Sequence, residues 1–140
     1  MNNYSLTFTP IHRNLLHSYW PQLKEFIGDA LARAHDSMTL DDVLGLLIEG
    51  KSNLFGAFEN HKPVGACTVE ILQFPRTRIA LIAQLGGHDI ERLLTLLPQL
   101  DMWVRDHECD TMRLLGRRGW ERMLAKEDFE FSYICLDRRL

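Results

Sequence analysis

The sequence has few cysteines and no metal-binding pattern. Its three cysteines, Cys67, Cys109 and Cys135, include no C-x-x-C spacing. Neither a disulfide framework nor a zinc ribbon is therefore indicated, and free, buried thiols are expected. The six histidines contain no pair at i and i+4, the spacing with which a helix presents two imidazoles to one metal ion. We expect no metal cofactor.

Long apolar runs and a strong charge of one sign are also missing. No stretch approaches the roughly 18 uninterrupted apolar residues of a membrane helix, and the opening MNNYSLTFTP has no basic region followed by an apolar run. The net charge of −3 favours neither a nucleic acid nor an anionic membrane as partner. We expect a cytoplasmic protein without a targeting signal.

Sequence motifs for hydrolysis and redox chemistry are missing as well. The chain has no nucleophile elbow, no Walker loop and no dinucleotide fingerprint. What is present is the composition of a globular protein, with 46% hydrophobic and 25% charged residues over 140 positions. This length and composition predict a single folded domain spanning residues 1–140.

The first part of the chain predicts a short strand from Ser5 to Thr9 and then two helices. The apolar stripe of the first helix recurs at spacings of three and four residues: Leu16, Trp20, Leu23, Ile27, Leu31 and Ala34. Because Pro21 lacks an amide donor, that helix either starts there or bends there. Thr39 is the expected N-cap of the second helix, and Gly50 is expected to end it.

The middle of the chain predicts three strands in an antiparallel meander. The extended runs are LFGAFE, VGACTVEILQF and RIALIAQL, and turn sequences separate them. A helical stripe from Ile90 to Val104 follows, with Asp89 as its N-cap and Pro98 kinking or dividing it.

The last part predicts a strand from Thr111 to Gly116, a helix from about Gly119 to Glu127, and a final strand from Phe129 to about Leu136. The strand, helix, strand order from Ile79 to Gly116 requires a parallel pair beside the meander. The predicted class is therefore mixed α/β (α+β), with one mixed sheet flanked by helices.

One junction has the features of an anion site. A helix that begins directly after a strand and two glycines offers unpaired amides and the positive end of a dipole, which suit a phosphate or pyrophosphate. The junction comprises Gln84, Leu85, Gly86, Gly87, His88 and Asp89. The alternative is an ordinary strand-to-helix turn whose glycines supply positive φ angles.

The order of elements and this junction resemble the GCN5-related N-acetyltransferase (GNAT) fold. In that family a Q/R-x-x-G-x-G/A loop after the fourth strand holds the pyrophosphate of acetyl-CoA. Gln84 matches the first position and Gly87 the central glycine, whereas Asp89 stands where the family has a small residue. The resemblance implies acetyl-CoA as cofactor, bound by Gln84 to Asp89. The Gly116 to Trp120 stretch is similar to divergent acetyltransferase-like proteins carried in phage genomes.

Two groups that the family often uses for proton transfer are missing. Counting back from Phe129 puts Leu124 where the family has the Tyr that acts as general acid, and Arg117 where the family has an Asn. The strand from Arg78 to Leu85 has no Glu or Asp that could serve as a base. Substitute candidates are Glu70 and Tyr133. The alternatives are a half-exposed strand carboxylate and a core aromatic with a wet hydroxyl.

Arg117 and Arg118 precede a helix, where the dipole disfavours cations. They either point into solvent or meet an anion or an acidic protein partner. Trp120 shares a helical face with Met123 and Leu124, which favours a core position.

Two functions follow from these observations. The first is a GNAT-like N-acetyltransferase that moves an acyl group from acyl-CoA to the amine of a small molecule or a protein. The second is an inactive protein of the same fold, kept as a binding or structural module and possibly derived from a phage. A homodimer through an exposed strand edge is a further expectation.

Overall fold

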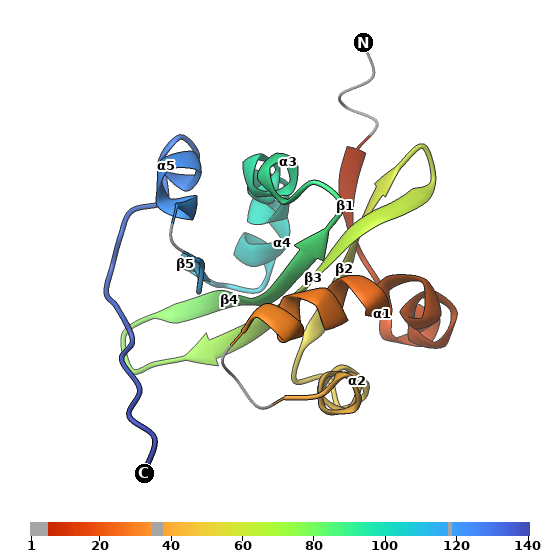
Figure 1. The fold of residues 1–140 in the computed structure, drawn as a ribbon, viewed down its shortest axis with the longest axis horizontal. Helices are drawn as coiled ribbons and strands as arrows, with labels where there is room; N and C mark the ends of the chain where they lie inside the picture. Colours follow the sequence, from red (N-terminus) through yellow and green to blue (C-terminus); the bar gives the residue numbers. More distant parts are fainter. Residues whose placement is uncertain (1–5, 35–37, 118) are drawn as a thin grey trace.

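A computed structural model describes residues 6–34, 38–117 and 119–140. Its centre is a five-stranded mixed sheet of order β1-β2-β3-β4-β5 (Figure 1). The first four strands are antiparallel neighbours, and β5 runs parallel to β4. The strands are β1 (Leu6–Pro10), β2 (Asn53–Glu59), β3 (Lys62–Gln73), β4 (Arg78–Gly87) and β5 (Thr111–Leu114). The predicted meander and parallel pair are confirmed, while Ser5 lies outside the described residues.

Two helices cover one face of the sheet. They are α1 (Leu16–Arg33), which follows a 3-10 turn η2 at Arg13–Leu15, and α2 (Leu40–Ile48). Their apolar sides share a core with the sheet face beneath them: Leu16, Leu23, Phe26, Ile27, Val43, Leu47, Leu54 and Ala66. The stripe predicted from the sequence supplies the helical part of this core.

Pro21 lies inside α1, which begins earlier, at Leu16. Of the two alternatives for Pro21, a helix that starts there is therefore wrong. Figure 1 shows α1 changing direction within its first half, as expected where proline removes a helical hydrogen bond. The bend turns the rest of the helix across the middle strands.

The start and end of α2 follow the local sequence. The Thr39 side chain accepts a hydrogen bond from the amide of Asp42, and the Asp42 carboxylate accepts one from the amide of Thr39. This reciprocal capping box satisfies amides that the first helical turn leaves unpaired. Gly50, with a φ of +76°, follows the last turn in the left-handed conformation that ends many helices.

The opposite face carries the larger core. Its helices are α3 (Ile90–Thr95), the 3-10 helix η3 (Leu97–Leu100), α4 (Asp101–Asp106) and α5 (Trp120–Ala125). Pro98 lies in η3, so the predicted division of the long helical stripe is confirmed. Trp120, Met123 and Leu124 all belong to or pack against this core, as their shared helical face predicted.

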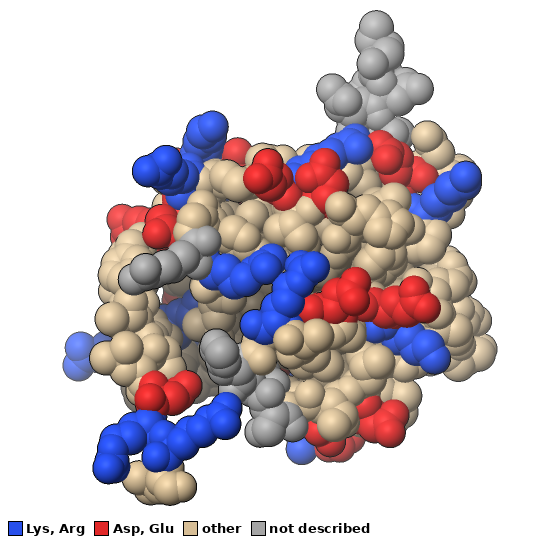
Figure 2. Space-filling view, viewed as in Figure 1, with Lys and Arg blue, Asp and Glu red and all other residues tan. Residues whose placement is uncertain are grey.

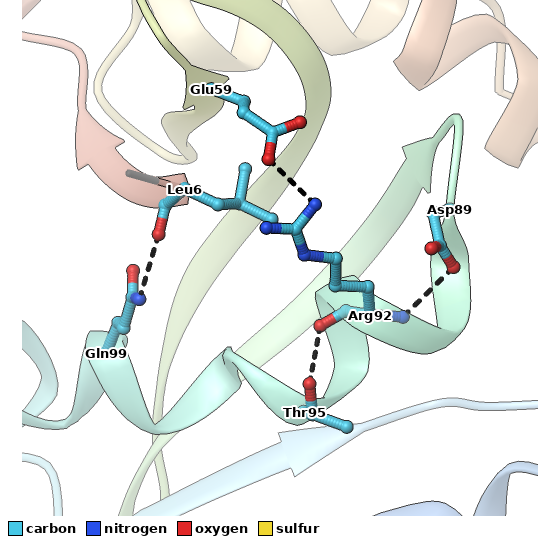
Figure 3. A network of polar contacts seen from close by, with 6 residues as sticks. All are labelled: Leu6, Glu59, Asp89, Arg92, Thr95 and Gln99. Atoms are coloured by element: carbon cyan, nitrogen blue, oxygen red, sulfur yellow. Dashed lines mark hydrogen bonds and ion pairs between the residues drawn. The ribbon is translucent and has the colours of Figure 1, made fainter. Parts of the chain in front are cut away.

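The outer edge of β1 is covered by one side chain. The Gln99 Oε1 atom accepts a hydrogen bond from the amide of Phe8 at 2.8 Å. The Gln99 Nε2 atom donates to the carbonyl of Leu6 at 3.3 Å, as Figure 3 shows. An edge strand exposes a row of unpaired backbone groups, and Gln99 occupies two of them. The side chain also fastens η3 to the beginning of the described chain.

The prediction of a final strand from Phe129 to Leu136 is wrong. Residues 129–140 have no regular secondary structure, and residues 131–140 are all exposed. The composition of this segment, which we call the tail, favours a strand, but a strand also needs a neighbour with which to pair its backbone. The preceding strand is also shorter than predicted and ends at Leu114 instead of Gly116.

Candidate functional site

The main feature of the site is a divergence of β4 from β5. Thr68 faces Gln84 across the β3–β4 ladder, whereas Val69 faces Ile82, so Ala83 is an extra residue on β4. An extra residue of this kind is a β-bulge, which bends a strand and ends regular pairing. The pairing of β4 with β5 stops at Ile82. In the described part of the chain, residues 83–87 therefore have no strand partner on their β5 side (Figure 1).

Gln84 is buried and bonded within the sheet. The Thr68 hydroxyl donates to Gln84 Oε1 and accepts from the Gln84 amide at 3.2 Å. Thr68 is fully buried and Gln84 is 7% exposed, so both bonds lie in a water-poor environment where an unpaired polar group is costly. The Gln84 side chain thus fixes the bulge.

The two glycines of the junction lie in β4, and their role is close packing. A Cβ on Gly86 would lie 2.0 Å from the carbonyl oxygen of Phe26, and one on Gly87 would lie 2.4 Å from Leu93 Cδ1. Neither glycine has a positive φ, so the alternative interpretation of a positive-φ turn is wrong. Gly86 lets the backbone of α1 approach the sheet, and Leu85 beside it is buried in the opposite core.

The last two residues of the junction connect β4 to α3. The His88 amide donates to the Val64 carbonyl at 3.0 Å, and its exposed ring meets Phe26 edge to face at 5.1 Å between centroids. The Asp89 carboxylate accepts from the Arg92 amide at 3.2 Å, which confirms Asp89 as the N-cap. The amides of Ile90 and Glu91 have no acceptor among the described residues.

The nearest cation on α3 is already paired. Arg92 Nη1 lies 2.8 Å from Glu59 Oε2, an ion pair between α3 and the end of β2 (Figure 3). Both side chains are about one-third exposed, so solvent and salt weaken the pair. The Asp89 carboxylate and this pair leave the start of α3 less attractive to an anion than the bare amides would be.

Glu70 is part of a second group of polar side chains, on the face of the sheet that α1 covers. Neighbouring strands place Glu70 opposite Leu81, and Leu81 beside Arg113. Met112 and Leu114 pack into the opposite core, so alternation along β5 puts Arg113 on the α1 side. Glu70 and Arg113 therefore lie in one row across three strands, with Leu81 between them.

Tyr133 joins this row from the tail. Its ring centroid lies 5.4 Å from the guanidinium carbon of Arg113, within the range of a cation–π contact. Tyr133 is 55% exposed, so the interpretation as a core aromatic is wrong. The structure thus brings the two catalytic candidates to the same face of the sheet, with Tyr133 in contact with Arg113.

Burial raises the pKa of the half-buried Glu70 carboxyl, because desolvation disfavours its charged form. Its description as a half-exposed strand carboxylate is confirmed. Burial also raises the pKa of the fully buried Cys67 thiol, so this cysteine is not a nucleophile. Cys109 is buried and Cys135 is exposed, and all three thiols are free. The expectation of burial is therefore wrong for Cys135.

Arg117 has a partner that the sequence did not suggest. It is exposed, and its guanidinium carbon lies 4.8 Å from the centroid of the Trp120 ring. The ring offers a cation–π contact that balances the unfavourable position before α5. Arg118 lies outside the described residues. Figure 2, which views the α1 side, shows positive and negative side chains interspersed over that face.

Sequence reasoning missed the residues whose role depends on tertiary pairing, above all Thr68 and Arg113. A threonine within an apolar strand is the only local signal for Thr68. No cluster of three or more potential metal ligands occurs in residues 6–34, 38–117 and 119–140. In the same ranges no helix has the length and apolar content to cross a membrane.

Comparison with solved structures assigns the fold. An aminoglycoside acetyltransferase from an uncultured soil metagenomic sample, in complex with sisomicin, superposes with a TM-score of 0.72 at 14% identity, covering 100% of this chain and 99% of that one. A ribosomal-protein-alanine N-acetyltransferase from Brucella melitensis biovar Abortus 2308 gives 0.63 at 18% identity, covering 96% and 97%.

A predicted acetyltransferase from Clostridium acetobutylicum, with acetyl-CoA, gives 0.65 at 12% identity and covers 96% of both chains. No protein-family profile and no curated protein sequence matches the chain. The chain has the GNAT fold, with its five-stranded mixed sheet flanked by helices.

Proposed function

We propose that the protein transfers an acetyl or other acyl group from acyl-CoA to an amine. The observation that carries this proposal is the divergence of β4 from β5 after Ala83, with the start of α3 at the end of the unpaired stretch. The acetyltransferases that share the fold support an acyl-transfer role.

The residues at the divergence fit the elongated thiol arm of CoA. The arm carries amide groups, and residues 83–87 present a strand edge with free backbone donors and acceptors on the β5 side. The pyrophosphate would be held by the amides of Ile90 and Glu91, with His88 beside them. Asp89 opposes the pyrophosphate, because its carboxylate faces the same helix start. Acyl-CoA supplies a thioester, which is an activated acyl group.

Glu70 is the proposed general base. An amine acceptor is protonated at neutral pH and must lose a proton before it can attack a thioester carbonyl. The raised pKa of Glu70 brings this carboxylate closer to the strength that a base at neutral pH needs. Glu70 takes the ammonium proton and passes it to water before the attack. As the new C–N bond forms and the C–S bond breaks, the amine nitrogen loses a second proton to Glu70 and the departing thiolate takes up one.

Tyr133 is the proposed proton donor to the departing thiolate. Its phenol lies over Arg113 in the row that contains Glu70. A phenol hydroxyl can donate a proton to a thiolate that leaves beside it. Placing the acyl donor and the amine together supplies much of the rate in such transfers.

The acceptor is an amine of a small molecule or of a protein. A protein partner would meet Arg117, which is exposed beside Trp120. The cytoplasmic location, the phage relationship and the use of Gln84 to Asp89 as the cofactor loop remain predictions.

Thermal unfolding of the protein with and without about 1 mM acetyl-CoA tests the proposal. A ligand at about 100 times its dissociation constant adds roughly 2.7 kcal/mol to stability, or several degrees. We expect an upward shift, followed by thiol release with a panel of amines. A folded protein whose melting temperature does not move would overturn the proposal in favour of a binding or structural module.

A further inference from the structure

Glu70 and Arg113 carry opposite charges on one face of the sheet, but no ion pair joins them. They lie in the row described above, with Leu81 between them. In the described part of the chain, neither charged group has a hydrogen-bond or ion-pair partner. The Arg113 guanidinium contacts the Tyr133 ring, and this contact leaves its N–H donors without an oxygen acceptor.

The row is partly open to solvent and apolar in its middle. Glu70, Leu81 and Arg113 are all half-buried, and Leu81 belongs to neither apolar core. Charged groups that are partly withdrawn from water attract a complementary ion more strongly than the same groups in bulk solvent. The row therefore presents a group for a cation, an apolar contact and a group for an anion, in that order.

The strand spacing limits the size of a ligand that spans this row. Neighbouring strands lie about 4.8 Å apart, so the Cα atoms of Glu70 and Arg113 are separated by roughly 10 Å. With both side chains upright on the sheet, hydrogen bonds of about 2.8 Å at each end leave roughly 4 Å between the two charged groups of the ligand. A short methylene chain covers that distance and would lie over Leu81.

We infer that the acceptor is an amine that carries a carboxylate at the other end of a short apolar chain. Glu70 receives the amine, Leu81 contacts the chain, and Arg113 binds the carboxylate. The acyl group is transferred to the nitrogen, and the carboxylate passes unchanged into the product. The role of this ligand as acceptor rests on the proposed acyl transfer, whereas its recognition needs no acyl donor.

A carboxylate suits Arg113 better than the other groups that could end such a chain. The planar guanidinium binds a planar carboxylate through bidentate hydrogen bonds. A second amine would bring a like charge next to Arg113, which costs affinity. A neutral amide offers a weaker acceptor than a carboxylate, because hydrogen bonds between ionised partners are stronger.

Binding in the absence of any acyl donor tests the recognition. The probes are 4-aminobutyrate, 4-aminobutanamide and 1,4-diaminobutane, which share one chain length and differ at the end that would meet Arg113. We expect isothermal titration to show 4-aminobutyrate binding at least ~10-fold more tightly than either of the others, the size of effect that a charge-assisted hydrogen bond produces. Equal affinities for all of them, or no binding of 4-aminobutyrate, would overturn the inference.

A matched pair of arginine variants assigns the carboxylate to its residue. Arg113→Gln should abolish the preference for 4-aminobutyrate over 4-aminobutanamide. Arg105→Gln removes the same charge from an exposed position on α4, on the opposite face of the sheet, and should keep the preference. A preference that survives in Arg113→Gln would count against the inference. The wild-type comparison decides the matter even where a variant fails to fold.

Acetylation separates this inference from the proposed function. With acetyl-CoA, kcat/KM for thiol release should be at least ~10-fold higher for 4-aminobutyrate than for 4-aminobutanamide. If both are acetylated equally well, acyl transfer stands and the inference is wrong. If 4-aminobutyrate binds through Arg113 while acetyl-CoA neither binds nor reacts, the recognition stands and acyl transfer is wrong.

Discussion

Gly86 lies directly against the backbone of Phe26, so that a Cβ at this position would be 2.0 Å from the Phe26 carbonyl oxygen. The contact joins the middle of α1 to β4 at the point where β4 has left β5. Because the obstructing atom belongs to a helix backbone, rotation of a side chain cannot relieve it.

We therefore expect Gly86→Ala to lower the free energy of unfolding by about 3 kcal/mol, the upper part of the range for overpacking. Gly45→Ala is the matched control: nothing lies within 4 Å of a Cβ there, and alanine in a helix stabilises by roughly 0.5–1 kcal/mol. Urea unfolding of both variants measures the difference. Equal stabilities would contradict the close approach. Since Gly87 is also packed against Leu93, the same argument makes Gly87 a poor site for probing cofactor binding.

Thr68 and Gln84 should behave as a coupled pair. Thr68→Val removes the hydroxyl and leaves Gln84 unpaired in the interior, which should cost ~1–3 kcal/mol of unfolding free energy. Combining it with Gln84→Met removes the unpaired side-chain group and should recover part of that loss. A double-mutant cycle in urea measures the coupling. If the two losses simply add, the hydrogen bond contributes nothing.

Some features were predictable because they depend on neighbouring residues. Thr39 and Asp89 are recognisable as helix caps from the positions that follow them. A proline inside a helical pattern predicts a bend or a division, and the chain shows a bend near Pro21 and a division at Pro98. The core stripe of α1 follows from spacing alone. These features need no knowledge of what lies across the sheet.

Other features depend on distant partners. The bulge at Ala83 is set by pairing with β3, and the requirement for glycine at residue 86 comes from α1, far away in sequence. The row of Glu70 and Arg113 arises only once three strands are in register. The tail shows why such features cannot be predicted locally: its residues favour a strand, but they do not reveal whether a neighbouring strand is there to pair with it.

The titration of Glu70 should be visible in stability. The folded protein has the higher pKa for this carboxyl and so holds its proton more tightly than the unfolded chain. Between the ordinary value of 4.5 and the raised one, the free energy of unfolding therefore decreases as pH rises. Glu70→Gln should remove this decrease. The variant should therefore gain stability relative to the wild type at pH values above that window. Urea unfolding across pH 4 to 8 checks it, and parallel curves for variant and wild type would disprove it.

The same substitution should change catalysis if Glu70 is the base. We expect Glu70→Gln to lower kcat/KM for an amine acceptor by about 10²-fold or more, the usual contribution of a general base. The acidic limb of the pH–rate profile should also disappear. An unchanged profile would assign the proton transfer elsewhere.

Asp89 should weaken the binding of acyl-CoA. Asp89→Asn keeps a capping side chain of similar quality and removes one negative charge from the start of α3. We expect acetyl-CoA to bind about fivefold more tightly, as ~1 kcal/mol of repulsion is relieved. Isothermal titration measures it. Asp41→Asn removes the same charge from the first turn of α2, on the other face of the sheet, and should leave the affinity unchanged.

The cover that Gln99 provides over β1 limits how this sheet can grow. A sheet open at both edges can add copies without end and form a fibre. Here the Gln99 amide occupies two backbone groups on the outer edge of β1, whereas the outer side of β5 has no strand partner in the described residues. A glutamine from a short 3-10 helix thereby makes β1 a poorer template for a further strand.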